Sequence, residues 1–227
     1  MVHDDATPDP AAGTATAPGL ADGHGDHVDG NGALRIALSG GPGGGKTTAA
    51  DLFRREIGDS VIIVPESATM LFAGGFPRVH ESTAQRSVQK AIFEVQRSLE
   101  DIQRKLYPDR VLLCDRGTVD GAAYWPDGPD GFFEAMGSTH GAELARYDTV
   151  IFFETAAVGG ISVEGGNRFR TETEEQAVAL DARLRDLWSA HPNFHLVPHD
   201  TSFLRKITMG LSILESVVST QRDRSSR

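Results

Sequence analysis

The chain has 227 residues, a length that favours one domain with terminal extensions over two large domains. Hydrophobic residues make up 39% and charged residues 24%, which is typical of a folded globular core and excludes a wholly disordered chain. The net charge of -10 argues against binding to nucleic acid or to an anionic membrane surface. No apolar run approaches the roughly 18 residues of a membrane span, and the first residues lack a secretion signal. We therefore expect a cytoplasmic protein without membrane insertion. Its single cysteine, Cys114, cannot form an intramolecular disulfide.

Composition divides the chain into three parts. Residues 1–31 contain six Asp, three Pro and five Gly but no Lys, Arg or aromatic residue, so we expect a disordered acidic N-terminal arm. Residues 32–220 hold the regular apolar patterns and are the predicted folded domain. Residues 221–227 are polar and basic, and we expect a flexible C-terminal tail.

Short apolar runs alternate with segments of helical periodicity. Four of the five runs are almost continuously apolar, which is typical of parallel strands covered on both faces. This alternation predicts a three-layer α/β sandwich around a five-stranded parallel sheet, with P-loop NTPase topology. The predicted strands are 34–39, 61–64, 111–114, 149–153 and 194–197, and the predicted helices follow Lys46 and span 82–106, 172–190 and 202–219.

The second predicted helix, 82–106, has the clearest pattern. Its apolar residues recur every three or four positions from Val88 to Leu106, and Pro108 lies just beyond its end. Ser82 and Gln85 have the spacing of a capping box, so we expect them to begin the helix.

The segment GGPGGGKTT contains the pattern G-x-x-x-x-G-K-[ST] between an apolar strand and a helix, the context of a phosphate-binding loop. Glycines allow backbone N–H groups to surround a polyphosphate, and the helix directs its positive end at the anion. We expect Lys46 to bridge the β- and γ-phosphates and Thr47 to bind Mg²⁺. The predicted nucleotide-binding residues are Gly40, Gly41, Gly43, Gly44, Gly45, Lys46, Thr47 and Thr48. The implied ligands are ATP and Mg²⁺.

Two acidic residues follow predicted strands. Asp115 comes directly after the run 111–114, and strand carboxyl ends converge beside the phosphate loop, so Asp115 is a candidate for holding Mg²⁺ or a substrate hydroxyl. Glu66 follows the run 61–64, where a carboxylate can accept the proton of an attacking hydroxyl. The structural alternatives are an Asp that caps a turn and a solvated loop Glu.

Arg168 and Arg170 lie in a glycine-rich stretch between the fourth strand and the next helix. Two arginines on such a loop suit a lid that closes over ATP and balances charge on the transferred phosphoryl group. The alternative is a surface loop with incidental arginines. For the acceptor pocket, the candidates are Gln89 and Gln96 on one helix face and Tyr124 with Trp125, although solvated glutamines and core aromatics are the commoner interpretation.

Taken together, these motifs resemble the P-loop kinase-like ATPase family that includes the ribosylnicotinamide kinase domain and the TRPL-translocation-defect type proteins. More distantly, they resemble the deoxynucleoside and thymidylate kinases. The resemblance spans about residues 34–214 and rests on GGPGGGKTT, VPES, AIFEVQ, CDRGTVDGAAYW, NRFRTETEEQ and HPNFHLVP in this order. It implies that Glu66 activates the acceptor and that Asp115 and Arg116 form an acidic-Arg motif whose arginine supports the phosphates. The chain departs from the pattern at Gly117, where deoxynucleoside kinases have Ser.

Two functions are therefore considered. The first is an ATP-Mg²⁺-dependent phosphotransferase acting on a small hydroxylated acceptor, with Lys46, Glu66, Asp115, Arg116, Arg168 and Arg170 as catalytic residues. The alternative is a nucleotide-dependent switch or slow NTPase acting through a protein partner. The chain lacks the Asn-Lys-x-Asp tetrapeptide that reads guanine in Ras-like GTPases, which weakens the GTP form of this alternative.

Overall fold

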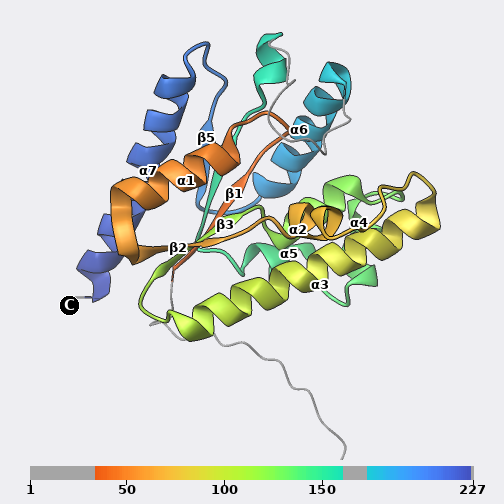
Figure 1. The fold of residues 1–227 in the computed structure, drawn as a ribbon, viewed down its shortest axis with the longest axis horizontal. Coiled ribbons are helices and arrows are strands. Elements are labelled where there is room, and N and C mark those ends of the chain that lie inside the picture. The colour runs from red at the N-terminus through yellow and green to blue at the C-terminus, as the bar shows by residue number, and fades with distance from the viewer. Residues whose placement is uncertain (1–33, 161–172, 226–227) are drawn as a thin grey trace, which may run out of the picture. The chain divides into compact units, whose positions relative to one another are not determined.

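The computed structural model describes residues 34–160 and 173–225, with the backbone alone from 221 onward. It confirms the predicted α/β sandwich: one five-stranded parallel sheet lies between two layers of helices (Figure 1). The strand order is β2-β3-β1-β4-β5, so the first strand is central. The strands are β1 (Arg35–Ser39), β2 (Val61–Val64), β3 (Val111–Asp115), β4 (Thr149–Phe153) and β5 (Phe194–Val197).

Alternate side chains of each strand enter opposite hydrophobic cores, because successive Cβ atoms of a strand point to opposite faces of the sheet. Along β4, Val150 and Phe152 pack in one core, whereas Ile151 and Phe153 pack in the other. All five β4 residues are buried. This two-sided burial explains why the sequence of β4 is continuously apolar rather than alternating.

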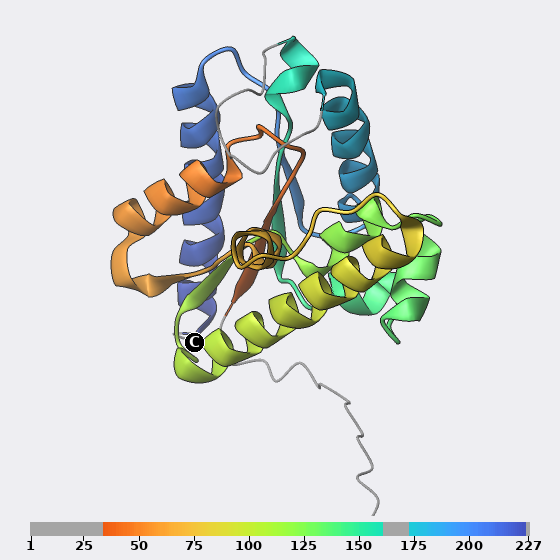
Figure 2. The ribbon, with the colours of Figure 1, turned by 45° about the vertical axis from the view of Figure 1, so that its right-hand side comes forward.

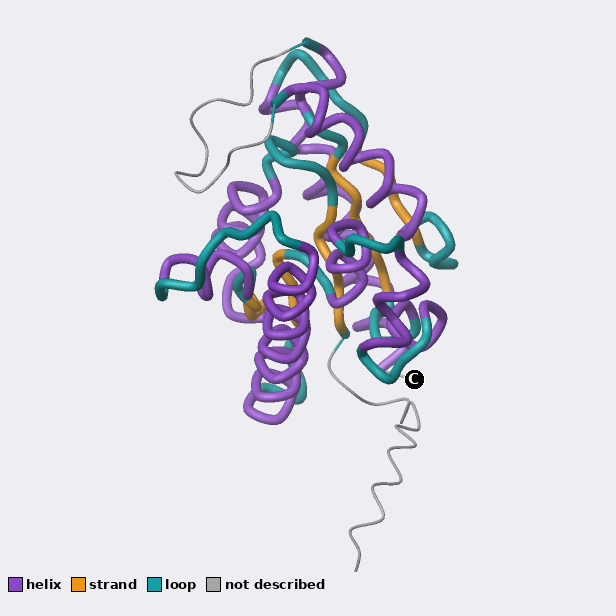
Figure 3. Tube along the Cα trace, turned by 90° about the vertical axis from the view of Figure 1, so that its right-hand side faces the viewer, coloured by secondary structure: helices purple, strands orange, loops and turns teal. Residues whose placement is uncertain are grey.

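The helices cover the two faces of the sheet separately (Figure 2). Helices α1 and α7 pack on one face, while α3 and α6 cover the other with the shorter α4 and α5. A tube view from the side shows the strands enclosed between these helices (Figure 3). The helices are α1 (Lys46–Ile57), α2 (Ser67–Ala73), α3 (Ser82–Leu106), α4 (Pro129–Ala135), α5 (His140–Leu144), α6 (Glu174–Trp188) and α7 (Phe203–Ser225).

Several local features differ from the sequence-based expectations. Helix α3 has the predicted bounds, but the predicted capping box of Ser82 and Gln85 is wrong. Glu81 is the N-cap instead, and its carboxylate accepts hydrogen bonds from the backbone N–H groups of Thr83 and Ala84 at 2.9 and 2.8 Å. A carboxylate with two oxygens satisfies two free amides at once, which a serine hydroxyl cannot do.

The last helix is longer than expected. Helix α7 continues to Ser225, into the segment 221–227 that the sequence predicts as a flexible tail. The short helices α2, α4 and α5 and the 3-10 helix at Thr118–Tyr124 were also not predicted, because each is too short to display a helical period. Among the helices that the structure describes, none has both the length and the apolar character needed to cross a membrane.

Candidate functional site

The phosphate loop joins the end of β1 to the start of α1, as the sequence predicts. Its backbone has positive φ at Gly40 (133°), Gly43 (75°) and Gly45 (89°), a conformation that glycine adopts without strain. At Gly40, an added Cβ would lie 2.0 Å from the carbonyl oxygen of Phe153 in β4. The first glycine of the motif is therefore required both by its dihedral angle and by the close approach of the neighbouring strand.

The N-terminus of α1 is open to an anion. Gly45 is the N-cap, no side chain caps the helix, and its first turn contains no acidic residue, so several backbone N–H groups lack an intrahelical acceptor. Lys46 folds back over the loop and donates hydrogen bonds to the carbonyl oxygens of Gly40 and Gly41 at 2.6 and 2.9 Å. Burial, followed by the charge of Arg116, lowers the pKa of Lys46 to about 7. A polyphosphate fits this donor set. Its oxygens would accept hydrogen bonds from the backbone N–H groups and from Lys46, and its negative charge would favour the protonated form of Lys46.

Thr47 and Asp115 meet beside the loop. The hydroxyl of Thr47, in the first turn of α1, donates a hydrogen bond to Oδ2 of Asp115 at 2.8 Å. Asp115 is the last residue of β3, and burial together with the nearby charge of Glu66 raises its pKa. Within 34–160 and 173–225, no three His, Cys, Asp or Glu residues cluster as a metal cage. This donor set fits Mg²⁺ bound with a nucleotide, because such an ion needs only one or two protein oxygens besides phosphate and water.

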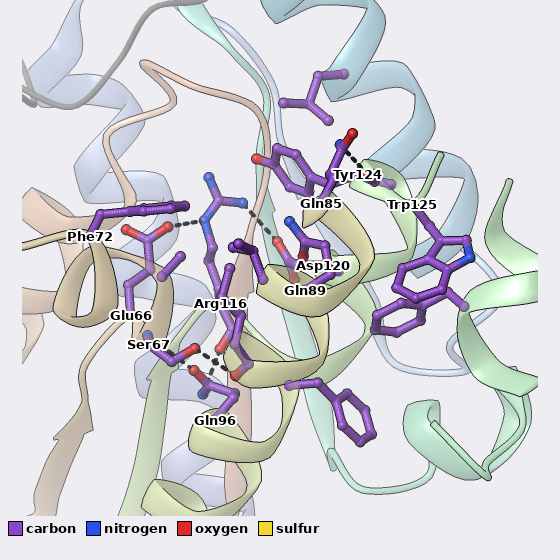
Figure 4. A pocket seen from close by; sticks show the side chains of 18 of the residues that line it. Glu66, Ser67, Phe72, Gln85, Gln89, Gln96, Arg116, Asp120, Tyr124 and Trp125 are labelled. Atoms are coloured by element: carbon purple, nitrogen blue, oxygen red, sulfur yellow. Dashed lines mark hydrogen bonds and ion pairs between the residues drawn. The ribbon is translucent and has the colours of Figure 1, made fainter. Parts of the chain in front are cut away.

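Glu66 and Arg116 form an ion pair (Figure 4). Nε of Arg116 lies 2.5 Å from Oε1 of Glu66, and the hydroxyl of Thr69 donates to Oε2 at 2.6 Å. Burial alone would raise the pKa of Glu66, but the charge of Arg116 and the hydrogen bond from Thr69 hold it below its ordinary value. Glu66 is therefore an ionised carboxylate at neutral pH, placed at the end of β2.

Asp120 fixes the other side of Arg116. Its carboxylate accepts hydrogen bonds from Nη1 of Arg116 at 2.9 Å, from the hydroxyl of Ser39 at 3.0 Å and from the indole of Trp188 at 3.0 Å. The backbone N–H of Gly117 donates to it at 3.2 Å. Asp120 is only 4% exposed, so these four hydrogen bonds satisfy a carboxylate that is buried between β1, β3 and α6.

The backbone at Arg116 and Gly117 is unusual. Arg116 has φ 75°, and no other non-glycine residue of the described ranges has a positive φ. Such a conformation is disfavoured for a side chain with a Cβ and persists where surrounding contacts impose it. At Gly117, an added Cβ would lie 2.8 Å from the rings of Trp188 and Tyr147. The departure from the serine of deoxynucleoside kinases thus accompanies aromatic packing that leaves no room for a side chain.

A pocket of about 590 Å³ opens beside this ion pair (Figure 4). Pro42 of the phosphate loop also contributes to its wall, so the pocket adjoins the loop. Its other walls come from α2, the connection between α2 and α3, α3, the segment after β3, α4 and α6. The aromatic residues in these walls are Phe72, Phe93, Tyr124, Trp125 and Phe132, and the polar and charged ones include Glu66, Arg78, Gln85, Gln89, Gln96, Arg116, Asp120 and Arg183.

The two glutamines predicted for the pocket have different surroundings. Both lie in its wall and both are buried. The side-chain amide of Gln96 is already hydrogen-bonded within the protein: it donates to Glu100 at 3.1 Å and to the carbonyl oxygen of Arg116 at 3.3 Å. The side-chain amide of Gln89 makes no hydrogen bond to another described residue, and it lies in the view of the pocket beside Asp120. Gln89 is therefore the better candidate for contact with a ligand.

Asp181 of α6 holds the outside of the phosphate loop. Its Oδ1 accepts hydrogen bonds from the backbone N–H groups of Gly41 at 2.6 Å and of Thr155 at 2.9 Å. The hydroxyl of Thr155 in turn donates to the carbonyl oxygen of Pro42. A Cβ at Gly41 would lie 2.6 Å from Oδ1 of Asp181, so this glycine is needed for the contact.

Asp120 and Asp181 were not predicted as site residues from the sequence. A signal for Asp181 does exist, since it is an acidic residue within the apolar stripe that includes Leu180 and Leu184 on α6. Asp120 lies in the quoted segment CDRGTVD, but only the fold brings it to Ser39 and Trp188. Gly43, Gly44 and Thr48 belong to the same loop and helix start as the other predicted nucleotide-binding residues. The predicted lid residues Arg168 and Arg170 lie outside the described residues.

Comparisons with known proteins agree with this geometry. A family model described as an AAA domain matches residues 35–203, which include the phosphate loop, Glu66, Asp115 and Arg116. Among solved structures, deoxyadenosine kinase from M. mycoides with bound dATP is similar, with a TM-score of 0.58 and 15% sequence identity. The alignment covers 80% of this chain and 99% of that chain, and at this identity it shows the fold alone. No curated protein matches the sequence. The chain belongs to the AAA domain family and is a P-loop NTPase with a nucleotide-kinase-like fold.

Proposed function

We propose that this protein is an ATP- and Mg²⁺-dependent phosphotransferase that acts on a hydroxyl group of a small molecule. The observation that carries the proposal is the ion pair of Glu66 and Arg116, which lies in the wall of a pocket adjoining the phosphate loop. Hydrolysis of a nucleotide alone does not require a binding site for another small molecule, whereas the pocket of about 590 Å³ lies beside an ionised carboxylate and could hold one. The bound dATP of the similar deoxyadenosine kinase is in keeping with a nucleotide at this fold.

The proposed reaction divides between the two sides of the site. Bound ATP-Mg²⁺ would supply the γ-phosphoryl group, and the cation would balance charge on the phosphate oxygens. Lys46 and the free amides of α1 bind the triphosphate, while Thr47 and Asp115 provide protein oxygens for the metal ion. These groups position the donor and neutralise its charge without forming covalent bonds to it.

On the acceptor side, Glu66 accepts a hydrogen bond from the acceptor hydroxyl. As the acceptor oxygen bonds to the γ-phosphorus and the bond to the departing ADP oxygen breaks, the hydroxyl proton passes to the Glu66 carboxylate. A carboxylate with a lowered pKa is a weak base, so this transfer occurs as the hydroxyl becomes acidic in the transition state. Arg116 stays charged and favours the negative charge that develops nearby. The roles of Arg168 and Arg170 stay predictions from the sequence.

The test is ATP consumption with Mg²⁺, with and without a pooled panel of nucleosides, nucleotides, sugars and vitamin ribosides, followed by mass analysis of the products. A mass gain of one phosphoryl group on a panel member supports the proposal and identifies the acceptor class. ATP loss without any phosphorylated small molecule contradicts it and favours the alternative of a switch that acts through a protein partner.

A further inference from the structure

The charged residues of the pocket do not balance one another. Both of its carboxylates, Glu66 and Asp120, are bonded to the same cation, Arg116. Each also has further donors, such as the hydroxyl of Thr69 for Glu66 and the indole of Trp188 for Asp120. Asp120 accepts four hydrogen bonds inside the wall, whereas Glu66 accepts two from the described residues and keeps capacity for an acceptor hydroxyl. Together with Arg116, the two carboxylates carry one net negative charge, which does not offset two further cations.

Two further arginines lie in the pocket wall. Arg78 is in the connection between α2 and α3, and Arg183 is on α6. The guanidinium of Arg78 lies 4.3 Å from the ring centroid of Phe72, which packs against it without neutralising its charge. Neither arginine forms an ion pair with a carboxylate of the described residues. Both residues are exposed, so the pocket wall includes two guanidinium groups, from separate structural elements, that are not paired with any carboxylate that the structure describes.

The rest of the wall combines apolar and aromatic surface with uncharged polar side chains. Phe72, Trp125 and Phe132 supply flat apolar surface, and Gln89 supplies the side-chain amide described above. Such a pocket suits a ligand that has an apolar or planar body. The guanidinium groups of Arg78 and Arg183 present paired N–H donors, which match the oxygens of a phosphate or carboxylate.

We propose that the acceptor of this site carries an anionic group, a phosphate or a carboxylate, which Arg78 and Arg183 bind while the acceptor hydroxyl faces Glu66. The inference rests on the proposed phosphotransferase function and narrows its substrate class from any small hydroxylated molecule to an acidic one. Arg78 and Arg183 are then specificity-determining residues, and they have no part in the transfer of the phosphoryl group itself.

The test uses thermal unfolding with the phosphate loop first saturated by a non-hydrolysable ATP analogue and Mg²⁺. Three aromatic probes of similar size are then titrated: phenyl phosphate, phenylacetate and the neutral benzyl alcohol. Preferential stabilisation by an anionic probe is expected, and the comparison of phenyl phosphate with phenylacetate separates the two oxyanion classes. Each of Arg78→Gln and Arg183→Gln should weaken binding of that probe by about tenfold, the size of a lost charge-assisted hydrogen bond.

The matched control is the double variant Arg54→Gln/Arg55→Gln, which removes the same charge from exposed positions on α1 away from the pocket. It should bind the anionic probe as the unchanged protein does, whereas Arg78→Gln/Arg183→Gln should lose the preference. Equal binding of the neutral probe, no binding of either anionic probe, or full retention of the preference in Arg78→Gln/Arg183→Gln would overturn the inference. Failure of the ATP analogue itself to stabilise the protein would instead overturn the proposed function, and this inference with it.

Discussion

The phosphate loop and the pocket that we propose for the acceptor are built in different ways. The loop is a continuous segment between β1 and α1, and its geometry follows from local requirements such as the positive φ of Gly40 and Gly45. The pocket is assembled from α2, the connection between α2 and α3, α3, the segment after β3, α4 and α6, which are spread along the sequence. A local motif can therefore identify the nucleotide-binding half of the site, whereas the substrate of the other half depends on the fold as a whole.

The largest effect is expected at the loop. Lys46→Ala removes the cation that we assign to the triphosphate, so both ATP affinity and turnover should fall, with turnover reduced by roughly 10²–10³-fold. Calorimetric titration with ATP-Mg²⁺ and a rate measurement check the two effects. The exposed variant Lys90→Gln is a control, and ATP affinity that is unchanged in Lys46→Ala would contradict the nucleotide site.

Glu66→Gln should separate acceptor phosphorylation from ATP binding. We expect acceptor phosphorylation to fall by about 10²–10⁴-fold because the proton acceptor is lost, while ATP affinity changes little. Product mass analysis and calorimetry measure these quantities. Glu56→Gln, an exposed change on α1, should leave both unchanged. Full acceptor turnover in Glu66→Gln would remove this residue from the mechanism.

Asp120→Asn sharpens the comparison, because Asp120 contacts Arg116 and we expect it to act through that residue and not on the nucleotide. Its amide cannot accept all four hydrogen bonds, so the maximal rate should fall by about tenfold and the free energy of unfolding by about 1–3 kcal/mol. ATP affinity should stay unchanged. Steady-state kinetics and urea unfolding test this, with the exposed Asp130→Asn as control. A loss of stability without any change of rate would make Asp120 purely structural.

Gly41→Ala tests the contact that joins the loop to α6. The added methyl group would lie 2.6 Å from Oδ1 of Asp181, so the loop must shift, and ATP affinity should weaken by several-fold to about tenfold. In contrast, Gly141→Ala in α5 has no atom within 4 Å of the added Cβ and should have no effect on ATP affinity. Titration of both variants measures the difference, and equal affinities would show that this contact does not position the loop.

The effect expected to be smallest for the site itself concerns Lys206 of α7, which we expect to affect stability rather than ATP binding and whose Nζ donates to the backbone carbonyl oxygen of Glu154. Burial lowers its pKa from 10.5 to about 8, so the folded state releases this proton at a lower pH than the unfolded state does. Between about pH 8 and 10.5 the unfolded chain binds more protons, and this group makes the folded state more stable as pH rises.

Lys206→Met removes this pH dependence. Relative to Lys206→Met, the unchanged protein should therefore gain stability as pH rises from 7 to 10, with no corresponding change below pH 7. Urea unfolding at several pH values measures the difference in free energy. A difference that is constant across this range would mean that the lysine has an ordinary pKa in the folded protein.

The sequence predicts the fold better than it predicts the site. Apolar runs, four of them almost continuous, identify all five strands because a parallel sheet is largely buried on both faces, and the sustained helical periodicity of α3 gives its bounds. The cap at Glu81 was missed because several neighbouring polar residues could begin the helix. Asp120 and Asp181 were missed because their partners are distant in sequence: Ser39 and Trp188 for Asp120, and Gly41 for Asp181.

The central claim is that a molecule bound in the pocket beside the Glu66–Arg116 pair accepts the phosphoryl group. The most direct test compares the amount of ATP consumed with the amount of phosphorylated acceptor formed. The measurement is made in parallel on the unchanged protein and on Glu66→Gln, with the same acceptor panel. We predict one phosphorylated acceptor for each ATP consumed in the former, and loss of that product with retained ATP binding in the latter. ATP consumption without phosphorylated acceptor in the unchanged protein would contradict the claim.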